Sequence, residues 1–179
     1  MRRVVVTGIG TINSTGHNVK DSFEAVVNGV CGIDTITLFD ASEFSVKIAG
    51  EVKDFDPTTV MDKKEVKKAD RFIQLGIKAA LEAMIDSGYV TQENKKVDAS
   101  IADRFGMISG SGIGGLSTIE RNSVVCETKG SRKVSPFFIP SSLANMLSGF
   151  ISIEHNLRGT SLSHVTACAA SNHSLNDAV

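Results

Sequence analysis

The sequence predicts an α/β fold in which short buried strands alternate with amphipathic helices. Apolar β-branched runs occur at residues 3–9 and 104–109, longer segments repeat apolar residues at helical spacing, and glycines stand where these segments end. A continuous apolar run is typical of a strand buried in a parallel sheet, and a stripe every three or four residues is typical of a helix that covers it. In folds of this kind, functional side chains stand at the carboxyl ends of strands.

The first half of the chain is expected to open with the strand at 3–9, followed by a helix over 19–28 that ends at Gly29. Residues 46–53 have the pattern of an edge strand, and a long amphipathic helix is expected over 66–88. Two apolar stripes support these helices: Phe23, Val26, Val27 and Val30 in the first, and Ile73, Ile77, Ala80, Leu81 and Met84 in the second.

The second half repeats the alternation of strand and helix, with polar or glycine residues at each expected boundary. Its expected elements are a buried strand over 104–109, a loop over 110–115, a helix toward Glu127, a helix capped by Ser141 or Ser142 and ended by Arg158-Gly159, and continued alternation over 161–179.

The composition is that of one ordinary domain or of part of a larger one. The chain has 179 residues, of which 41% are hydrophobic and 22% are charged, and its formal net charge is −1. This balance does not indicate a nucleic-acid partner. The apolar run after Arg3 is too short for a signal peptide or a membrane span, so no membrane association is expected.

The three cysteines indicate a reducing compartment. Cys31, Cys126 and Cys168 are odd in number and have no C-x-x-C or other metal-ligand spacing. Such a set argues against a disulfide framework and against a zinc site. A cytoplasmic protein without a bound metal is therefore expected.

Cys168 is the best candidate for chemistry. An alternating apolar segment leads into this cysteine, small residues flank it, and a helix is expected to follow. A thiol at a helix N-terminus lies at the positive end of the helix dipole, which favours the thiolate, and the free N–H groups there can hold an oxyanion. The alternative is a buried cysteine that only fills space in a core, which is the usual fate of this residue.

No histidine stands in sequence where it would serve Cys168 as a base. His173 lies five residues further along the expected helix, which turns its side chain about 140° away from that of Cys168. We interpret His173 as structural, and His164 on the preceding strand as a core or interface residue. The Cys168 thiol is then activated by the helix N-terminus alone, or by acid–base residues outside this sequence.

The glycine-rich loop at 110–115 has the pattern G-x-G-x-x-G, which between a strand and a helix is the outline of a dinucleotide fingerprint. The acidic residue that such sites need about 20 positions further on is missing, since residues 130–134 contain no Asp or Glu. We interpret the loop as a tight turn that lines a pocket, and no nucleotide cofactor is expected.

Several motifs, in the right order and over essentially the whole chain, resemble those of the elongating β-ketoacyl-acyl carrier protein synthases. They are Arg3-Val-Val-Val-Thr-Gly-Ile-Gly10, Phe72-Ile-Gln-Leu-Gly76, Gly110-Ser-Gly-Ile-Gly-Gly115, Ser135-Pro-Phe-Phe-Ile-Pro-Ser141, Leu157-Arg-Gly159 and Thr166-Ala-Cys168. The resemblance implies a thiolase-like fold with layered α-β-α-β-α architecture. It further implies that residues 1–179 are the N-terminal β-ketoacyl synthase domain, truncated inside the helix after the nucleophile.

By resemblance, Cys168 takes an acyl group from acyl carrier protein as a thioester, and an enolate from malonyl-carrier protein then attacks it. Ile113 and Phe138 match positions that line the acyl-chain tunnel in relatives, and the simpler interpretation makes either an ordinary core residue. The family's two decarboxylation histidines, a lysine and a gating phenylalanine come from the C-terminal half. The fragment alone is therefore expected to be inactive in condensation.

A basic cluster matches the surface where relatives dock the acidic carrier protein, although a run of charges is more often just a solvated helix face. Its members are Lys63, Lys64, Lys67, Lys68 and Arg71. The resemblance also implies a homodimer for the full-length protein and no cofactor.

Two departures from the family pattern lie near the nucleophile, where Ser171 and Asn176 stand at positions that are usually glycine in relatives. Their extra atoms are expected to crowd the helix against the neighbouring strand. Two other functions stay open, namely a non-catalytic half or pseudo-enzyme that binds the carrier protein, and a priming synthase that uses acyl-coenzyme A. The motifs at 110–115 and 135–141 favour the elongating group over the priming one.

Overall fold

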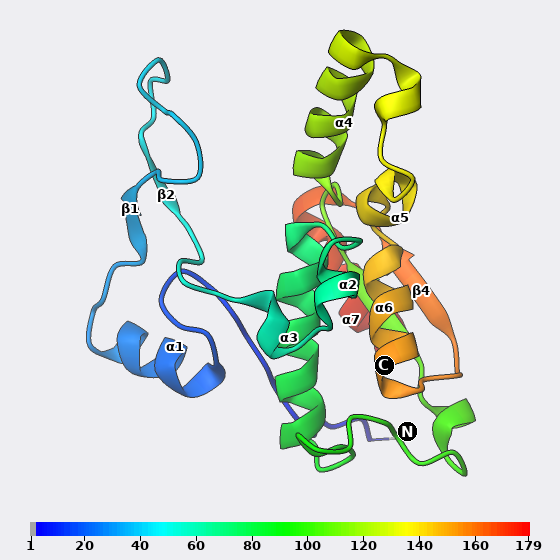
Figure 1. Ribbon diagram of the computed structural model, residues 1–179. Coiled ribbons are helices and arrows are strands. Elements are labelled where there is room, and N and C mark those ends of the chain that lie inside the picture. The colour runs from blue at the N-terminus through cyan, green and yellow to red at the C-terminus, as the bar shows by residue number, and fades with distance from the viewer. Residues whose placement is uncertain (1–2) are drawn as a thin grey trace.

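The computed structural model describes residues 3–179, which form two regions (Figure 1). The arm, residues 17–52, stands beside the body, residues 53–179, and residues 3–16 connect the two along α3. The arm carries α1 (Val19–Val27), β1 (Ile33–Thr35) and β2 (Ile48–Gly50). The body carries α2 (Lys63–Val66), α3 (Arg71–Asp86), β3 (Met107–Gly110), α4 (Leu116–Lys129), α5 (Phe138–Ser142), α6 (Met146–His155), β4 (Ser161–His164) and α7 (Ala170–Ala178).

The core of the body lies between α3 and α6. Ile73, Ile77 and Leu81 stand on one face of α3 and are buried in one cluster with Ile151 of α6. Each buried side chain of this size stabilises the fold by about 1.5–3 kcal/mol. The stripe predicted from the sequence is therefore the apolar face that joins the two helices.

The sheet of the body is parallel, as the sequence predicts. β3 pairs with β4 in a register that aligns Met107 with Ser161 and Gly110 with His164. The strand starts at Met107 rather than at the expected Arg104, because Ala102–Arg104 form a 3₁₀ turn. Both strands point their carboxyl ends toward the loops that carry the predicted site.

Helices α6 and α7 cover the two faces of this sheet. The hydroxyl of the fully buried Ser148 on α6 donates to the Leu162 carbonyl at 2.9 Å and lies 2.8 Å from Ser109 Oγ, within hydrogen-bond distance. The next residue of β3, Gly110, faces the other way and lies against the Ala170 carbonyl of α7. Since successive residues of a strand face opposite sides, the order α6, sheet, α7 is the start of a layered α/β architecture.

The prediction of a buried strand at residues 3–9 is wrong. Val4, Val5 and Val6 are 55 to 77% exposed, and the segment pairs with no strand among residues 3–179. Its backbone instead contacts α3, where the Ile9 N–H donates to Asp86 Oδ2 at 3.0 Å. A strand needs a neighbour to satisfy its ladder, and the apolar run alone does not supply one.

Helix α1 confirms the expected helix over 19–28 and its end at Gly29, which has φ 68°. The side chain of Asn18 caps its N-terminus by accepting from the Asp21 N–H at 2.8 Å. The predicted apolar stripe, however, is exposed, with Phe23 at 68%, and the buried residue of α1 is Ser22. No other described element packs closely on the apolar face of α1.

Two predicted helix starts are wrong for reasons of capping. The helix expected to begin at Val66 begins at Arg71, because Asp70 accepts from the Phe72 N–H and caps it there. Ser141 and Ser142 do not cap α6; they end the short α5, and α6 starts after Asn145 without a side-chain cap.

The expected edge strand at 46–53 is shorter in the structure and has a partner that the sequence did not indicate. β2 covers Ile48–Gly50 and pairs antiparallel with β1, aligning Ile33 with Gly50. Together they form the hairpin of the arm. Within residues 3–179, no helix combines the length and the apolar character needed to cross a bilayer.

Candidate functional site

Cys168 lies in a turn between the end of β4 and the start of α7, and its side chain is exposed. The preceding residue, Ala167, has φ 50°, a left-handed conformation that costs a residue with a Cβ about 1–3 kcal/mol. This turn lifts the cysteine out of the strand direction just before the helix begins. The interpretation of Cys168 as a sealed core residue is therefore wrong.

The turn leaves a hydrogen-bond donor free beside the thiol. The Ala169 N–H donates to the Thr166 carbonyl at 3.1 Å and the Ala170 N–H to the Ala167 carbonyl, whereas the Cys168 N–H finds no acceptor within residues 3–179. Free N–H groups at a helix N-terminus, together with the helix dipole, attract negative charge. Such a position can hold a thiolate or the oxyanion that forms when a thioester is attacked.

The histidines near Cys168 contact other groups. His173 Nδ1 lies 2.7 Å from the Thr166 hydroxyl, in a hydrogen bond across the turn. His164 Nε2 lies 2.9 Å from Asp177 Oδ2, although the angles there are not those of a hydrogen bond. In the part of the chain that the structure describes, neither imidazole is hydrogen-bonded to the Cys168 thiol.

The loop at 110–115 is a tight turn, as expected. Gly114 has φ 98° and lies against the Ser142 carbonyl and Ala144, so that a Cβ there would clash. The Gly115 N–H donates to the Ser142 carbonyl at 2.9 Å. These contacts lock the loop onto α5 and give a packing reason for its glycines.

Ile113 and Phe138, the two residues matched to the acyl-chain tunnel, stand on the loop and on α5. Ile113 is 62% exposed, and Phe138 is partly buried. The backbone bond between the loop and α5 therefore holds the two segments that carry them together. An exposed isoleucine on a rigid loop is available to contact an apolar ligand.

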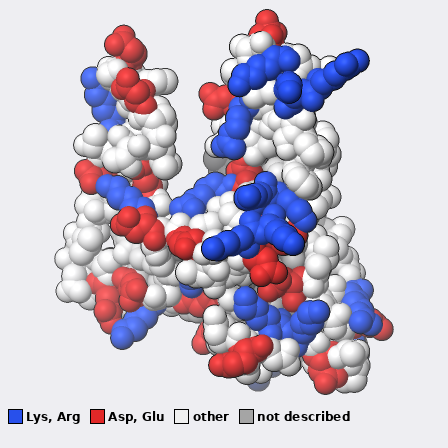
Figure 2. Space-filling model, in the orientation of Figure 1, with Lys and Arg blue, Asp and Glu red and all other residues white. Residues whose placement is uncertain are grey.

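The basic cluster gathers over α2 and the start of α3 (Figure 2). Lys63, Lys64 and Lys67 are exposed, and none of them forms an ion pair within residues 3–179. Three free ammonium groups on one short segment attract an acidic surface.

The other two members of the cluster are engaged within the chain. Arg71 donates to the carbonyls of Val52 and Phe55 at 3.1 and 3.3 Å and lies over the Phe55 ring, so it fastens the end of the arm to the body. Burial lowers the pKa of its guanidinium. Lys68 pairs with Glu65 at 2.6 Å. Of this cluster, Lys63, Lys64 and Lys67 are therefore the members that have no ion pair within residues 3–179.

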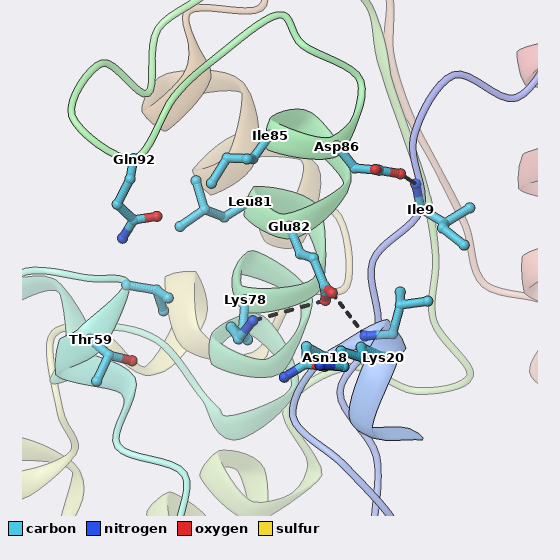
Figure 3. Close-up of a pocket in the computed structure, with 12 residues that line it drawn as sticks. Ile9, Asn18, Lys20, Thr59, Lys78, Leu81, Glu82, Ile85, Asp86 and Gln92 are labelled. Atoms are coloured by element: carbon cyan, nitrogen blue, oxygen red, sulfur yellow. Dashed lines mark hydrogen bonds and ion pairs between the residues drawn. The ribbon is translucent and has the colours of Figure 1, made fainter. Parts of the chain in front are cut away.

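A cavity of about 640 Å³ lies where the N-terminal segment and α1 meet α3 (Figure 3). Glu82 accepts from the N–H groups of Thr11 and Val19 at 3.1 and 2.8 Å, and Lys78 lies 3.9 Å from the same carboxylate. The Glu82 carboxylate therefore holds two backbone segments in place at this cavity. The sequence did not indicate this role for Glu82.

Sequence reasoning also missed Asp70. Its carboxylate accepts from the Phe72 N–H of α3 at 3.5 Å and, across the body, from the N–H and hydroxyl of Thr118 on α4 at 2.9 and 2.6 Å. An aspartate directly before an apolar stripe is a recognised N-cap signal and could have located the start of α3. The contact with Thr118, 48 residues away, has no signal in the sequence.

The expected crowding by Ser171 and Asn176 does not occur. Both side chains are exposed on α7, and the Asn176 amide lies 3.4 Å from the Asp177 carboxylate. The face of α7 that packs inward carries Ala170 and Ser174 instead.

Comparison with known proteins gives a consistent result along the whole chain. The family model for the beta-ketoacyl synthase N-terminal domain matches residues 1–179. The chain is 44% identical to 3-oxoacyl-[acyl-carrier-protein] synthase 2 of Coxiella burnetii and 47% identical to that of Vibrio harveyi. Each alignment covers 99% of this chain and 41% of the relative, so the chain spans less than half the length of these relatives.

Solved structures show the same fold. The ishigamide ketosynthase/chain length factor superposes with a TM-score of 0.82 at 28% identity, over 96% of this chain and 42% of that one. A type II polyketide ketosynthase, solved in complex with its acyl-carrier protein, gives a TM-score of 0.77 at 22% identity, over 99% of this chain and 46% of that one. These likenesses confirm the thiolase-like α/β fold.

Proposed function

This chain belongs to the β-ketoacyl synthase family, of which it carries the N-terminal domain, and on that premise we propose that it serves in an elongating 3-oxoacyl-[acyl-carrier-protein] synthase. In this proposal residues 1–179 are the nucleophile-bearing half of the enzyme. The names of the two relatives above support this reaction over the priming reaction that uses acyl-coenzyme A.

The observation that carries the proposal is the position of Cys168. An exposed thiol follows a left-handed Ala167 and precedes α7, with a free backbone N–H beside it. A strained turn that presents a nucleophile between a strand and a helix is a recurrent solution in acyl-transfer enzymes, because the following N–H groups then face the developing oxyanion.

In the proposed first step, the Cys168 thiolate attacks the carbonyl carbon of an acyl thioester on the carrier protein. The oxyanion of the tetrahedral intermediate accepts from the Cys168 N–H, and the carbon–sulfur bond to the carrier breaks. The acyl group is then held on Cys168, and the carrier leaves as a thiolate, which takes a proton from water. In the second step, malonyl-carrier protein loses carbon dioxide and its enolate carbon attacks this thioester, which releases the Cys168 thiolate.

We propose that the basic cluster receives the carrier protein through Lys63, Lys64 and Lys67, which are exposed and unpaired within the described residues. Ile113 and Phe138 are proposed to line the path of the acyl chain. Arg71 is proposed to support this surface without binding the carrier itself, because its guanidinium donates hydrogen bonds to the Val52 and Phe55 carbonyls. By family resemblance we further propose a cytoplasmic homodimer as the working form of the whole protein.

The test is transfer of a radiolabelled acyl group from acyl carrier protein to this chain. Label is expected on the wild-type chain and absent from Cys168→Ala. The other two exposed cysteines provide matched controls, since Cys31→Ala and Cys126→Ala also remove an exposed thiol and are expected to keep the label.

Two results would overturn the proposal. Label that persists in Cys168→Ala assigns the thioester to another residue. A chain that binds the carrier protein but takes no label would be a non-catalytic half, whose exposed lysines bind the carrier without any reaction at Cys168. Release of carbon dioxide from malonyl-carrier protein is expected to be absent with residues 1–179, because the family's decarboxylation histidines belong to its C-terminal half.

A further inference from the structure

One buried carboxylate caps two helices of the body. Asp70 is 9% exposed and stands directly before α3. Its carboxylate accepts a hydrogen bond from the Phe72 N–H of that helix. Its other oxygen accepts both the N–H and the hydroxyl of Thr118, the third residue of α4. α4 begins at Leu116, and its N-cap residue, Gly115, has no side chain that could cap it. Asp70 therefore supplies the negative charge at the N-termini of α3 and α4 together.

A third element joins at the same place. The Ser141 hydroxyl at the end of α5 donates to the Lys68 carbonyl at 2.7 Å, two residues before Asp70. The backbone at Gly115 is so close that a Cβ there would lie 3.2 Å from the Asp70 Cβ. We name these contacts of Asp70, Thr118, Ser141 and Gly115 the junction.

The junction connects all the predicted site segments other than Cys168. The basic cluster leads into Asp70, the loop with Ile113 leads into Gly115, and α5 begins with Phe138 and ends at Ser141–Ser142. The basic cluster lies far in sequence from the other two segments, since Asp70 and Thr118 are 48 positions apart. Their relative placement depends on a few short hydrogen bonds to one carboxylate and one carbonyl.

We propose that Asp70 is a positioning residue that fixes the carrier-docking surface relative to the acyl-binding loop. The inference rests on the proposed function and names a determinant within it. A carrier protein seated on Lys63, Lys64 and Lys67 delivers its acyl group at a distance and angle set by this carboxylate. A small acyl thioester does not use the basic cluster, so its reaction at Cys168 does not depend on that geometry.

The test compares two identical substitutions on α4. Thr118→Val removes the 2.6 Å hydroxyl bond to Asp70 and keeps the shape of the side chain. Thr128→Val is the matched control, because its hydroxyl only donates to the Val124 carbonyl of the same helix. The measured quantities are the rate of Cys168 labelling by acyl carrier protein, the rate of labelling by acyl-N-acetylcysteamine, and amide exchange over residues 110–118.

Thr118→Val is expected to slow labelling by acyl carrier protein about tenfold relative to Thr128→Val, the factor that corresponds to loss of one hydrogen bond to a charged group. Labelling by the small thioester is expected to be unchanged, and amide exchange over 110–118 to be faster. Thr118→Ser restores the hydroxyl and is expected to restore the wild-type rate with the carrier protein. A stable fold in each variant is checked by circular dichroism.

The inference is overturned if Thr118→Val slows both substrates equally, because the junction then shapes the nucleophile rather than the docking geometry. It is also overturned if Thr118→Val and Thr128→Val exchange amides at the same rate over 110–118. A wild-type chain that takes label from neither substrate refutes the proposed function and with it the docking role of Asp70, and the exchange comparison then tests only whether Asp70 holds the loop at 110–118 in place.

Discussion

The arm and the body contain apolar stripes of the same kind, and the structure treats them in opposite ways. In the body, the stripe of α3 is buried, and Ile73 has no exposed surface. In the arm, the stripe of α1 is exposed, and Leu38 beyond β1 is 79% exposed. Helical spacing thus shows that a helix has an apolar face, but the burial of that face depends on a second element that packs against it.

The two regions also differ in what holds them. The body is held by the packing of α3 against α6, whereas polar contacts hold the arm. The Glu51 carboxylate accepts from the N–H and hydroxyl of Thr37 and from the Leu38 N–H, and Lys53 pairs with Asp34 at 2.8 Å. A region held by hydrogen bonds and an exposed ion pair is expected to open locally before the core does.

The largest expected effect separates the two stripes directly. Ile73→Ala deletes a fully buried side chain and is expected to lower the free energy of unfolding by about 2–5 kcal/mol. Phe23→Ala removes a larger side chain from the exposed face of α1 and is expected to change it by no more than about 0.5 kcal/mol. Urea denaturation followed by circular dichroism measures both. Equal losses would show that the arm has a core of its own.

A smaller effect is expected where α3 meets α6. A Cβ at Gly76 would fall within the Leu147 side chain, whereas the nearest atom to a Cβ at Gly149 of α6 is Met146 Cε at 3.9 Å. Gly76→Ala is expected to lower the free energy of unfolding by about 1 kcal/mol, since overpacking against Leu147 outweighs the gain in helix propensity. Gly149→Ala is the matched control and is expected to raise the free energy of unfolding by about 0.5–1 kcal/mol. Thermal unfolding measures the pair, and stabilisation by both would contradict the close packing of the two helices.

The smallest effect is a local pH dependence in the arm. The Thr37 hydroxyl, followed by the Thr37 and Leu38 N–H groups, lowers the pKa of Glu51 from its ordinary value of 4.5. A carboxylate with a lowered pKa in the folded state contributes its stability above that ordinary value, and this contribution is lost as the pH falls through the folded pKa. The hairpin is therefore expected to loosen below pH 4.5 while the core of the body stays intact.

The amide resonances of Thr37 and Leu38, followed by NMR as the pH is lowered, measure this loosening. Glu51→Gln is the control, because the amide does not titrate and the acid transition of these two resonances is expected to disappear. A transition of the same midpoint in Glu51→Gln would assign the effect to another group.

The candidate site was predictable to different degrees. Cys168 could be found from the sequence because a local pattern, a strand end followed by small residues and a helix, is enough to indicate an exposed turn. The basic cluster could be found as a charge run, but its free members could not, since the engagement of Arg71 depends on carbonyls that lie 16 and 19 residues before it. The link from Asp70 to Thr118 joins the starts of α3 and α4, which only the fold brings together.

By itself, the sequence determined the alternation of helices and strands, the end of α1 at Gly29 and the place of Cys168 after β4, because each depends on residues within one or two turns of chain. The tertiary structure decided which apolar runs are buried, which serines cap or end a helix, and which cations stay free. Those outcomes depend on partners distant in sequence, and an exposed Val5 and a buried Ile73 look alike until the element that covers one of them is in place.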